Sequence, residues 1–296
     1  MQLVQFALFS NLHQEPSAIA GATFLPKGTC ADPHRRAKIK RGILMKIEAA
    51  IAIIPARFGS TRFPGKLLTE IEGKTLIELV YRRVEQARFV GRILVATDDQ
   101  RISDTVRRFG GTAVMTRNDH PSGTDRLAEA AQDFDSDSLV VNVQGDEPMI
   151  EPSDIDRAIT AARLGDAEMV TLMTRLDSAQ ADDPNRVKVV TDRNGIALYF
   201  SRSRIPSGGT CFLHLGLYVY RVAFLKRFMK LERTPLEIAE RLEQLRALEH
   251  GYRIRVVEVE SESWGIDTPE DLERFCKLER ERLGQTPPAK RESLLI

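Results

Sequence analysis

The chain has 296 residues, 42% of them hydrophobic and 29% charged, and this composition argues against an intrinsically disordered protein. Its 43 basic and 42 acidic residues give a formal net charge of +1, but residues 1–44 hold six basic and two acidic side chains, so the rest is slightly acidic. A slightly acidic body argues against general nucleic-acid binding, and no apolar run approaches the length of a membrane span.

Residues 1–44 are predicted to be a disordered or artefactual extension, with Met45 as the candidate true start. The first residues are only mildly apolar and carry no preceding basic residue, so they make a poor signal peptide. A targeting or binding arm is the alternative. We expect one domain over 45–283 and a loose tail over 284–296. Three scattered cysteines form neither a disulfide framework nor a metal motif, which favours a reducing compartment.

The first half of the body alternates strand and helix patterns. Strands are predicted at 49–56, 92–97, 112–115 and 138–143, and helices at 75–87, 99–109 and 124–134. The first strand, AAIAIIPA, is a nearly continuous apolar run, as expected of a parallel strand buried on both faces. Alternation at this spacing indicates βαβ units and a mostly parallel sheet with helices on both faces.

The second half has a different pattern, which predicts an antiparallel insertion in the same α/β domain. Strands are predicted at 169–174, 187–191, 196–200, 213–221 and 253–259, and helices at 234–249 and 268–282. Asn194 and Gly195 are typical of a hairpin turn between two of these strands. Thr234, Pro235 and Glu237 predict the start of the first helix, with Glu237 completing a capping box.

The loop after the first strand, ARFGSTRFPGK at 56–66, is a candidate phosphate-binding segment. Ligands of open α/β sheets bind at the carboxyl ends of the strands, where Arg57, Arg62 and Lys66 could surround a phosphate group. The loop matches neither the dinucleotide fingerprint nor the P-loop, so those two readings are excluded. A surface loop with solvated charges is the alternative.

Two carboxylates are candidate magnesium ligands. Asp146 follows the strand at 138–143, and Asp267 lies just before the predicted N-cap Thr268. Magnesium typically takes one or two carboxylates together with phosphate oxygens. Gly-Asp-Glu-Pro is also typical of a turn, and Glu147 is assigned to that turn.

Ser122 to Thr124 begin a predicted helix, whose free amides could contact a base or ribose, although ordinary capping explains part of this pattern.

Nine segments together resemble the 3-deoxy-manno-octulosonate cytidylyltransferases, also called CMP-Kdo synthetases. In chain order they read IIPARFGSTRFPGK, ATDD, MTRNDHPSGTDRLAEA, VNVQGDEPMI, VKVVTD, ALYFSRSRIP, HLGLYVYR, PLEIAERLEQLRALEHG and GIDTPEDLE. The resemblance covers about residues 46–277. It implies a GT-A-like nucleotide-diphospho-sugar transferase fold and a Mg²⁺-dependent reaction of CTP with Kdo to give CMP-Kdo and pyrophosphate. It also implies a cytoplasmic homodimer that supplies lipopolysaccharide biosynthesis.

The resemblance also implies roles for particular residues. Arg57, Lys66, Asp146 and Asp267 would be catalytic, and Asp146 and Asp267 would hold the metal. Nucleotide contacts would come from Ala56, Arg57, Ser60, Arg62, Lys66, Met115, Ser122, Gly123, Thr124 and Arg126. Sugar contacts would come from Gln144, Arg202, His214, Tyr218, Glu237 and Gln244. Three of these have structural alternatives: Glu237 as a capping residue, and His214 and Tyr218 as core residues of a strand.

Two departures from the family pattern concern the sugar. The family usually carries a basic residue before the histidine, where this chain has Leu213, and the segment 206–213 is short. An amino-substituted Kdo analogue is therefore an alternative acceptor. Another 2-keto acid sugar such as a sialic acid is a further alternative, because that family is similar at the first loop, although QGDEP and GIDTPEDL favour Kdo. A nucleotide-sensing protein without catalysis is the alternative outside enzymes.

Overall fold

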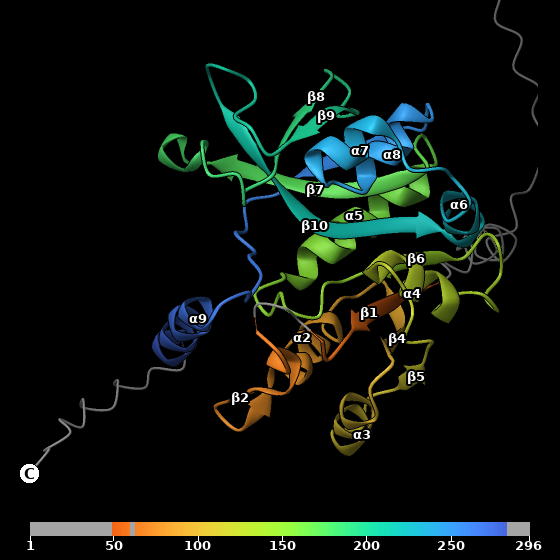
Figure 1. The fold of residues 1–296 in the computed structure, drawn as a ribbon, viewed down its shortest axis with the longest axis vertical. Helices are drawn as coiled ribbons and strands as arrows, with labels where there is room; N and C mark the ends of the chain where they lie inside the picture. The colour runs from red at the N-terminus through yellow and green to blue at the C-terminus, as the bar shows by residue number, and fades with distance from the viewer. Residues whose placement is uncertain (1–48, 60–62, 283–296) are drawn as a thin grey trace, which may run out of the picture. The chain divides into compact units, whose positions relative to one another are not determined.

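The computed structural model describes residues 49–59 and 63–282 (Figure 1). The chain divides into two units, 1–47 and 48–296, and all of the described residues belong to the second. The predictions for residues 1–44, for Ser60 and Arg62, and for the tail at 284–296 lie outside the described residues.

Nine strands of the described chain form one sheet, with the order β11-β7-β10-β6-β1-β4-β5 and with β8 and β9 attached at β10. The strands are β1 (Ala50–Ala56), β4 (Val90–Thr97), β5 (Ala113–Met115), β6 (Leu139–Asn142), β7 (Met169–Leu176), β8 (Lys188–Thr191), β9 (Ala197–Ser201), β10 (Cys211–Arg221) and β11 (Ile254–Glu258). Pairing is parallel from β6 through β1 and β4 to β5, and antiparallel where β10 meets β6 and β7. The predicted mixture of a parallel sheet and an antiparallel part is confirmed.

Helices cover both faces of the sheet (Figure 1). They are α2 (Leu76–Val84), α3 (Gln100–Arg108), α4 (Gly123–Ala130), α5 (Pro152–Leu164), α6 (Val222–Phe228), α7 (Pro235–Glu240), α8 (Gln244–Glu249) and α9 (Pro269–Arg282). Of these, α5 and α6 were not predicted from the sequence, nor were the short 3-10 helices η1 (Lys66–Leu68) and η2 (Ser178–Gln180) and the hairpin of β2 (Glu70–Ile71) and β3 (Lys74–Thr75). None of the described helices is long and apolar enough to cross a membrane.

The apolar run of β1 supplies both hydrophobic cores. Ile53 and Ile54 are fully buried, but they belong to different clusters because successive side chains of a strand point to opposite faces. Ile54 packs with residues of α2, α3 and α5, whereas Ile53 packs with residues of α4, α6 and α8. Burial on both faces explains why the strand reads as apolar throughout, and it places the carboxyl end of β1 between two helical layers.

The predicted helix at 234–249 is wrong in its middle. It is divided into α7 and α8 at Arg241, which adopts a left-handed conformation with φ of 55°. The guanidinium of Arg202 accounts for this end, because its Nε donates to the Glu240 carbonyl at 2.8 Å. Leu242 is then buried in the core next to Leu245. The helical spacing of the sequence gives no sign of this break, after which the Glu243 side chain contacts the start of α4.

Candidate active site

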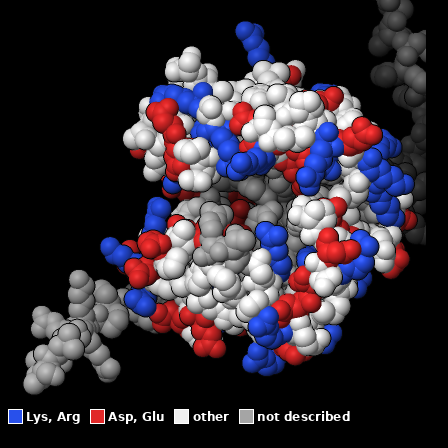
Figure 2. Space-filling view, in the orientation of Figure 1, with Lys and Arg blue, Asp and Glu red and all other residues white. Residues whose placement is uncertain are grey.

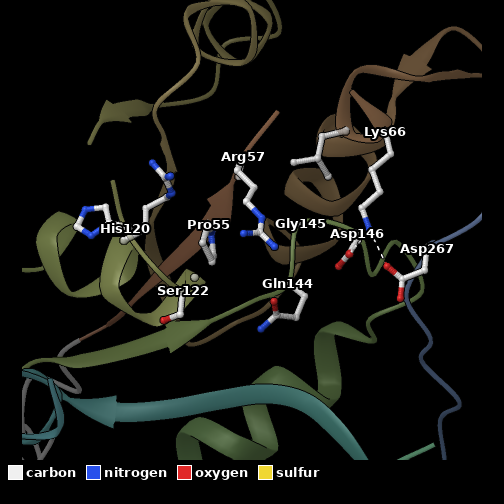
Figure 3. A pocket seen from close by; sticks show the side chains of 13 residues that line it. Pro55, Arg57, Lys66, His120, Ser122, Gln144, Gly145, Asp146 and Asp267 are labelled. Atoms are coloured by element: carbon white, nitrogen blue, oxygen red, sulfur yellow. Dashed lines mark hydrogen bonds and ion pairs between the residues drawn. The ribbon is translucent and has the colours of Figure 1, made fainter. Parts of the chain in front are cut away.

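A cavity of about 380 Å³ opens at the carboxyl ends of β1 and β6 (Figure 3). Its lining comes from four places: the end of β1 with Arg57, Lys66 at the start of η1, the start of α4 with Ser122, and the segment after β6 with Asp146, which Asp267 faces. Figure 2 shows the hollowed face of the molecule, with acidic side chains visible within the hollow. A polar cavity at strand ends is the expected ligand site of an open α/β sheet.

Lys66 joins the two predicted metal ligands. Its Nζ donates to Asp146 Oδ2 at 2.5 Å and to Asp267 Oδ1 at 2.9 Å, and it also contacts the Ile266 carbonyl at 2.9 Å. Burial by itself would lower the pKa of this ammonium, but the two carboxylates outweigh burial and raise the pKa above its ordinary value. The contacts prove that Asp146 and Asp267, 121 positions apart in the sequence, lie at one edge of the cavity.

The donor set at this edge suits magnesium. The described residues contain no group of three or more histidine, cysteine, aspartate or glutamate side chains that could hold a metal. Asp146 and Asp267 offer only oxygen, and Mg²⁺ commonly uses one or two carboxylates while water and substrate phosphates complete its shell. Because Asp146 and Asp267 both reach the Lys66 ammonium, their carboxylate oxygens lie close enough together to hold one such ion.

Glu147 takes a different position from its neighbour Asp146. Its carboxyl accepts a hydrogen bond from Ser263 Oγ at 3.0 Å and lies below Gly216 of β10, where an added Cβ would come within 3.0 Å of it. Burial, and next the charge of Asp146, raises the pKa of Glu147 to about 7. Glu147 does not line the cavity at β1 and β6, but it lines another cavity of about 480 Å³ with His214 and Asp267, and its assignment to the turn stays a prediction.

The loop between β1 and η1 is held from two sides. The Phe58 carbonyl accepts from the Gly65 N–H at 3.0 Å. Gly65 has a left-handed φ of 72°, which favours glycine, and an added Cβ would lie 3.1 Å from the Phe58 ring. The guanidinium of Arg101 covers the same ring, 3.4 Å from its centroid. Arg57 directly precedes Phe58 and Lys66 directly follows Gly65, and Figure 3 shows Arg57 directed toward the cavity.

The start of α4 brings several nucleotide candidates to the cavity. Ser122 is the N-cap, and its Oγ accepts from the Asp125 N–H at 3.2 Å. Ser122, Gly123 and Arg126 line the cavity, as does Ala56. Arg126 is also engaged elsewhere, because it donates to Thr116 at 2.5 Å and pairs with Asp98 at 3.0 Å. Met115, exposed at the end of β5, and Thr124 are not among the lining residues.

Two sugar candidates of β10 are buried next to one another. The rings of His214 and Tyr218 lie 5.4 Å apart, and His214 Nε2 is 2.9 Å from Thr171 Oγ1. Burial lowers the pKa of His214 to about 3, so the imidazole is neutral, and burial raises the pKa of Tyr218 above its ordinary value. Gln144, which lines the cavity, donates to the Gly216 carbonyl of the same strand at 3.2 Å.

Of the six sugar candidates only Gln144 lines the cavity at β1 and β6, while His214 lines another cavity of about 480 Å³ that also reaches Asp267. The guanidinium of Arg202 binds backbone carbonyls, including Glu240 at 2.8 Å and Pro184 at 3.0 Å. The Glu237 carboxylate accepts two hydrogen bonds from Arg246, at 2.6 and 2.8 Å. Gln244 is buried, and its Nε2 has no hydrogen-bond partner within 49–59 and 63–282.

Leu213 and His214 face opposite sides of β10. Leu213 packs with a cluster of Leu176, Ala181 and Cys211, while the His214 ring contacts Phe200 at 5.0 Å between centroids. Both residues nevertheless line the cavity of about 480 Å³, so the departure at Leu213 changes the wall of a cavity that His214 shares.

Two residues of the site were missed in the sequence. His120 lines the cavity and pairs with Glu129, and Glu243 contacts Ser122 and Thr124. His120 lies in the motif MTRNDHPSGTDR and could have been found there. Glu243 could not have been found in the sequence. The sequence predicts one unbroken helix over 234–249, and the contact of Glu243 with α4 depends on the break in that helix.

Comparisons with known proteins agree with this geometry. A family model described as cytidylyltransferase matches residues 51–254. The chain is 52% identical over 245 residues to a 3-deoxy-manno-octulosonate cytidylyltransferase of Geobacter metallireducens, covering 76% of this chain and 96% of the relative. A relative of the same name from Geobacter sulfurreducens is 53% identical over 244 residues, covering 76% of this chain and 97% of the relative.

Solved structures give the same result. A CMP:2-keto-3-deoxy-manno-octonic acid synthetase complexed with CTP superposes with a TM-score of 0.76 at 42% identity, covering 79% of this chain and 99% of the other. A putative glucose-1-phosphate thymidylyltransferase from Bacillus anthracis, at 18% identity and a TM-score of 0.57, covers 81% of this chain and 98% of its own, and it shares the fold alone.

Proposed function

Because the chain belongs to the 3-deoxy-manno-octulosonate cytidylyltransferase family, we propose that it transfers CMP from CTP to the anomeric hydroxyl of Kdo and releases pyrophosphate. The observation that carries this proposal is the cavity in which Arg57 and Lys66 face Asp146 and Asp267 at the ends of two parallel strands. Cations for a triphosphate and carboxylates for its metal therefore line the same cavity.

The reaction needs positioning and charge stabilisation rather than a protein nucleophile. The sugar hydroxyl attacks the α-phosphorus in line, and pyrophosphate leaves. Arg57 and Lys66 would bind phosphate oxygens and stabilise the negative charge that develops on them. Asp146 and Asp267 would hold Mg²⁺, which when bound supplies neutralisation of phosphate charge and alignment of the reacting oxygen.

The start of α4 would contact the nucleoside. Ser122 and Gly123 line the cavity, and Figure 3 shows Ser122 at the opposite end from Lys66. The nucleoside would therefore lie at the Ser122 end and the metal at the Lys66 end. Gln144, His214 and Tyr218 are proposed to lie on the acceptor side, since Gln144 reaches from the cavity to β10. Arg202, Glu237 and Gln244 are also proposed to contact the sugar. The side chains of Arg202 and Glu237 already bind other groups of the protein, so a sugar would have to share or displace those contacts.

We further propose a cytoplasmic homodimer that serves lipopolysaccharide biosynthesis. Cys211 and Cys276 are free thiols, as expected in a reducing compartment. Leu236 and Ile238 of α7 and Leu198 of β9 are exposed, and α7 and β9 are linked by the bond from Ser201 to Glu240. These three apolar side chains are candidates for the dimer contact.

The test is pyrophosphate release with CTP, Mg²⁺ and a panel of sugar acids. We expect release with Kdo. Release with an amino-substituted Kdo or with N-acetylneuraminate, but not with Kdo, would reassign the acceptor. Binding of CTP without release for any acceptor would favour the nucleotide-sensing alternative, and replacing CTP by UTP or ATP tests the base.

A further inference from the structure

A side chain from α8 reaches across to the start of α4. The Thr124 hydroxyl donates to Glu243 Oε2 at 2.5 Å, and the Ser122 hydroxyl lies 3.1 Å from Glu243 Oε1. Ser122 is the N-cap of α4 and lines the cavity that holds Arg57 and Lys66. The carboxylate therefore contacts the first turn of the helix proposed to meet the nucleoside.

The break between α7 and α8 puts Glu243 in this place. Arg241 leaves the helical conformation, and α8 begins again with Glu243 as its N-cap residue. The Glu243 side chain is 30% exposed and lies 3.7 Å from the guanidinium of Arg246. Arg246 is held in turn by Glu237 of α7, so the carboxylate is fixed from its own side as well.

The charge of Glu243 also suits its position. A carboxylate near a helix N-terminus is stabilised by the free amides and the dipole of that helix. The single Ser122 hydroxyl proton has two acceptors within reach, Asp125 Oδ2 at 2.7 Å and Glu243 Oε1 at 3.1 Å, and it donates to one of them at a time. Thr124 is buried, and its hydroxyl is oriented from outside the helix by Glu243. The contact thus fixes the first turn of α4 relative to the segment that follows α7.

We propose that Glu243 is a positioning residue for nucleotide binding, acting through Thr124 and Ser122 to hold the first turn of α4 in the geometry that accepts CTP. The inference rests on the proposed function. Ser122 lines the main cavity and also a second cavity of about 350 Å³ with Glu237 and Glu243. The same contact therefore joins the nucleotide side to the helices α7 and α8 that carry Glu237 and Gln244.

The experiment is a double-mutant cycle of Glu243→Ala and Thr124→Val, read as the dissociation constant of CTP and the KM for CTP. Each single variant is expected to weaken CTP binding about ten-fold, and the double variant to be no weaker than either single one. Glu243→Gln, which keeps an acceptor oxygen, is expected to recover part of the affinity. KM for Kdo is expected to change less than KM for CTP.

Glu249→Gln is the matched control. Its carboxylate also lies on α8, but it accepts from the Leu236 N–H of α7 at 3.0 Å and does not reach α4. We expect CTP affinity as in the unaltered chain. Thermal melting of every variant identifies loss of affinity that comes from unfolding, and the affinities are compared well below the lowest melting temperature.

Unchanged CTP affinity in Glu243→Ala would overturn the inference. A double variant whose loss of CTP affinity equals the product of the two single losses would also overturn it, because the two side chains would then act independently. An unaltered chain that binds CTP but releases no pyrophosphate with any sugar acid overturns the proposed function alone, because the cycle is read from CTP binding. An unaltered chain that does not bind CTP overturns both.

Discussion

The buried ion pair of Glu237 and Arg246 allows a sharp test of whether Glu237 acts in stability or in sugar binding. Two hydrogen bonds, at 2.6 and 2.8 Å, join the side chains, which are only 10% and 7% exposed. The Thr234 N–H also donates to the Glu237 carboxylate at 3.4 Å, as the predicted capping box requires. Substitution of Glu237 by Gln keeps the shape and removes the charge.

The loss in stability follows from the charge left behind. Removing one partner of a buried pair costs about 3–5 kcal/mol, because the other charge remains buried without compensation. Arg246 retains Glu243 at 3.7 Å and the ring of Phe228 at 4.9 Å from its centroid, so we take the lower end, about 3 kcal/mol. At about 2–4 °C per kcal/mol for a domain of this size, the melting temperature should fall by about 6–12 °C.

Urea unfolding and thermal melting measure this change, and the KM for Kdo is measured at a temperature where Glu237→Gln is folded. If Glu237 is structural, stability falls by the stated amount and KM for Kdo changes little. A loss of stability below about 1 kcal/mol would refute the reasoning from burial, since that is the range of an exposed pair. Unchanged stability with a large rise in KM would place Glu237 in the sugar site.

The remaining predictions concern the metal edge, the phosphate loop and acid pH. Asp146→Asn and Asp267→Asn should each abolish turnover while circular dichroism shows an unchanged fold; near-normal activity in both would remove them as metal ligands. Arg101→Ala uncovers the Phe58 ring and should raise KM for CTP about two- to five-fold, the size of an exposed cation–π contact, and an unchanged KM would separate this contact from the loop's function. Burial by itself would raise the pKa of Glu237, but the hydrogen bonds from Arg246 outweigh burial and lower it. The ion pair therefore contributes its full stability above the ordinary carboxyl pKa of 4.5. This contribution is lost as the pH falls through the lower pKa of the folded state. The stability difference between wild type and Glu237→Gln should therefore narrow below pH 4.5 in urea titrations, and a constant difference would contradict the assignment.

Local patterns predicted the elements whose burial is regular. The apolar run before Arg57 became β1 because both of its faces are covered, and the turn residues Asn194 and Gly195 lie between β8 and β9 as expected. The helix at 234–249 failed, because its division depends on Arg202 binding the end of α7 and on the burial of Leu242. Neither contact has a signature at helical spacing.

The sequence by itself determined the chemistry of this protein: strand ends followed by Arg57 and Lys66, by Asp146, and by a capped helix at Ser122, with Asp267 before a second cap. The local pattern and the resemblance to a family predict which of these side chains bind phosphate, metal or nucleoside. Only the tertiary structure decided which of them meet. The ammonium of Lys66 touches Asp146 and Asp267 because β1, β6 and the segment before α9 converge at one sheet edge, and Glu243 reaches α4 because a helix ends early. Contacts between residues more than a hundred positions apart depend on how sheet and helices pack, which no local periodicity encodes.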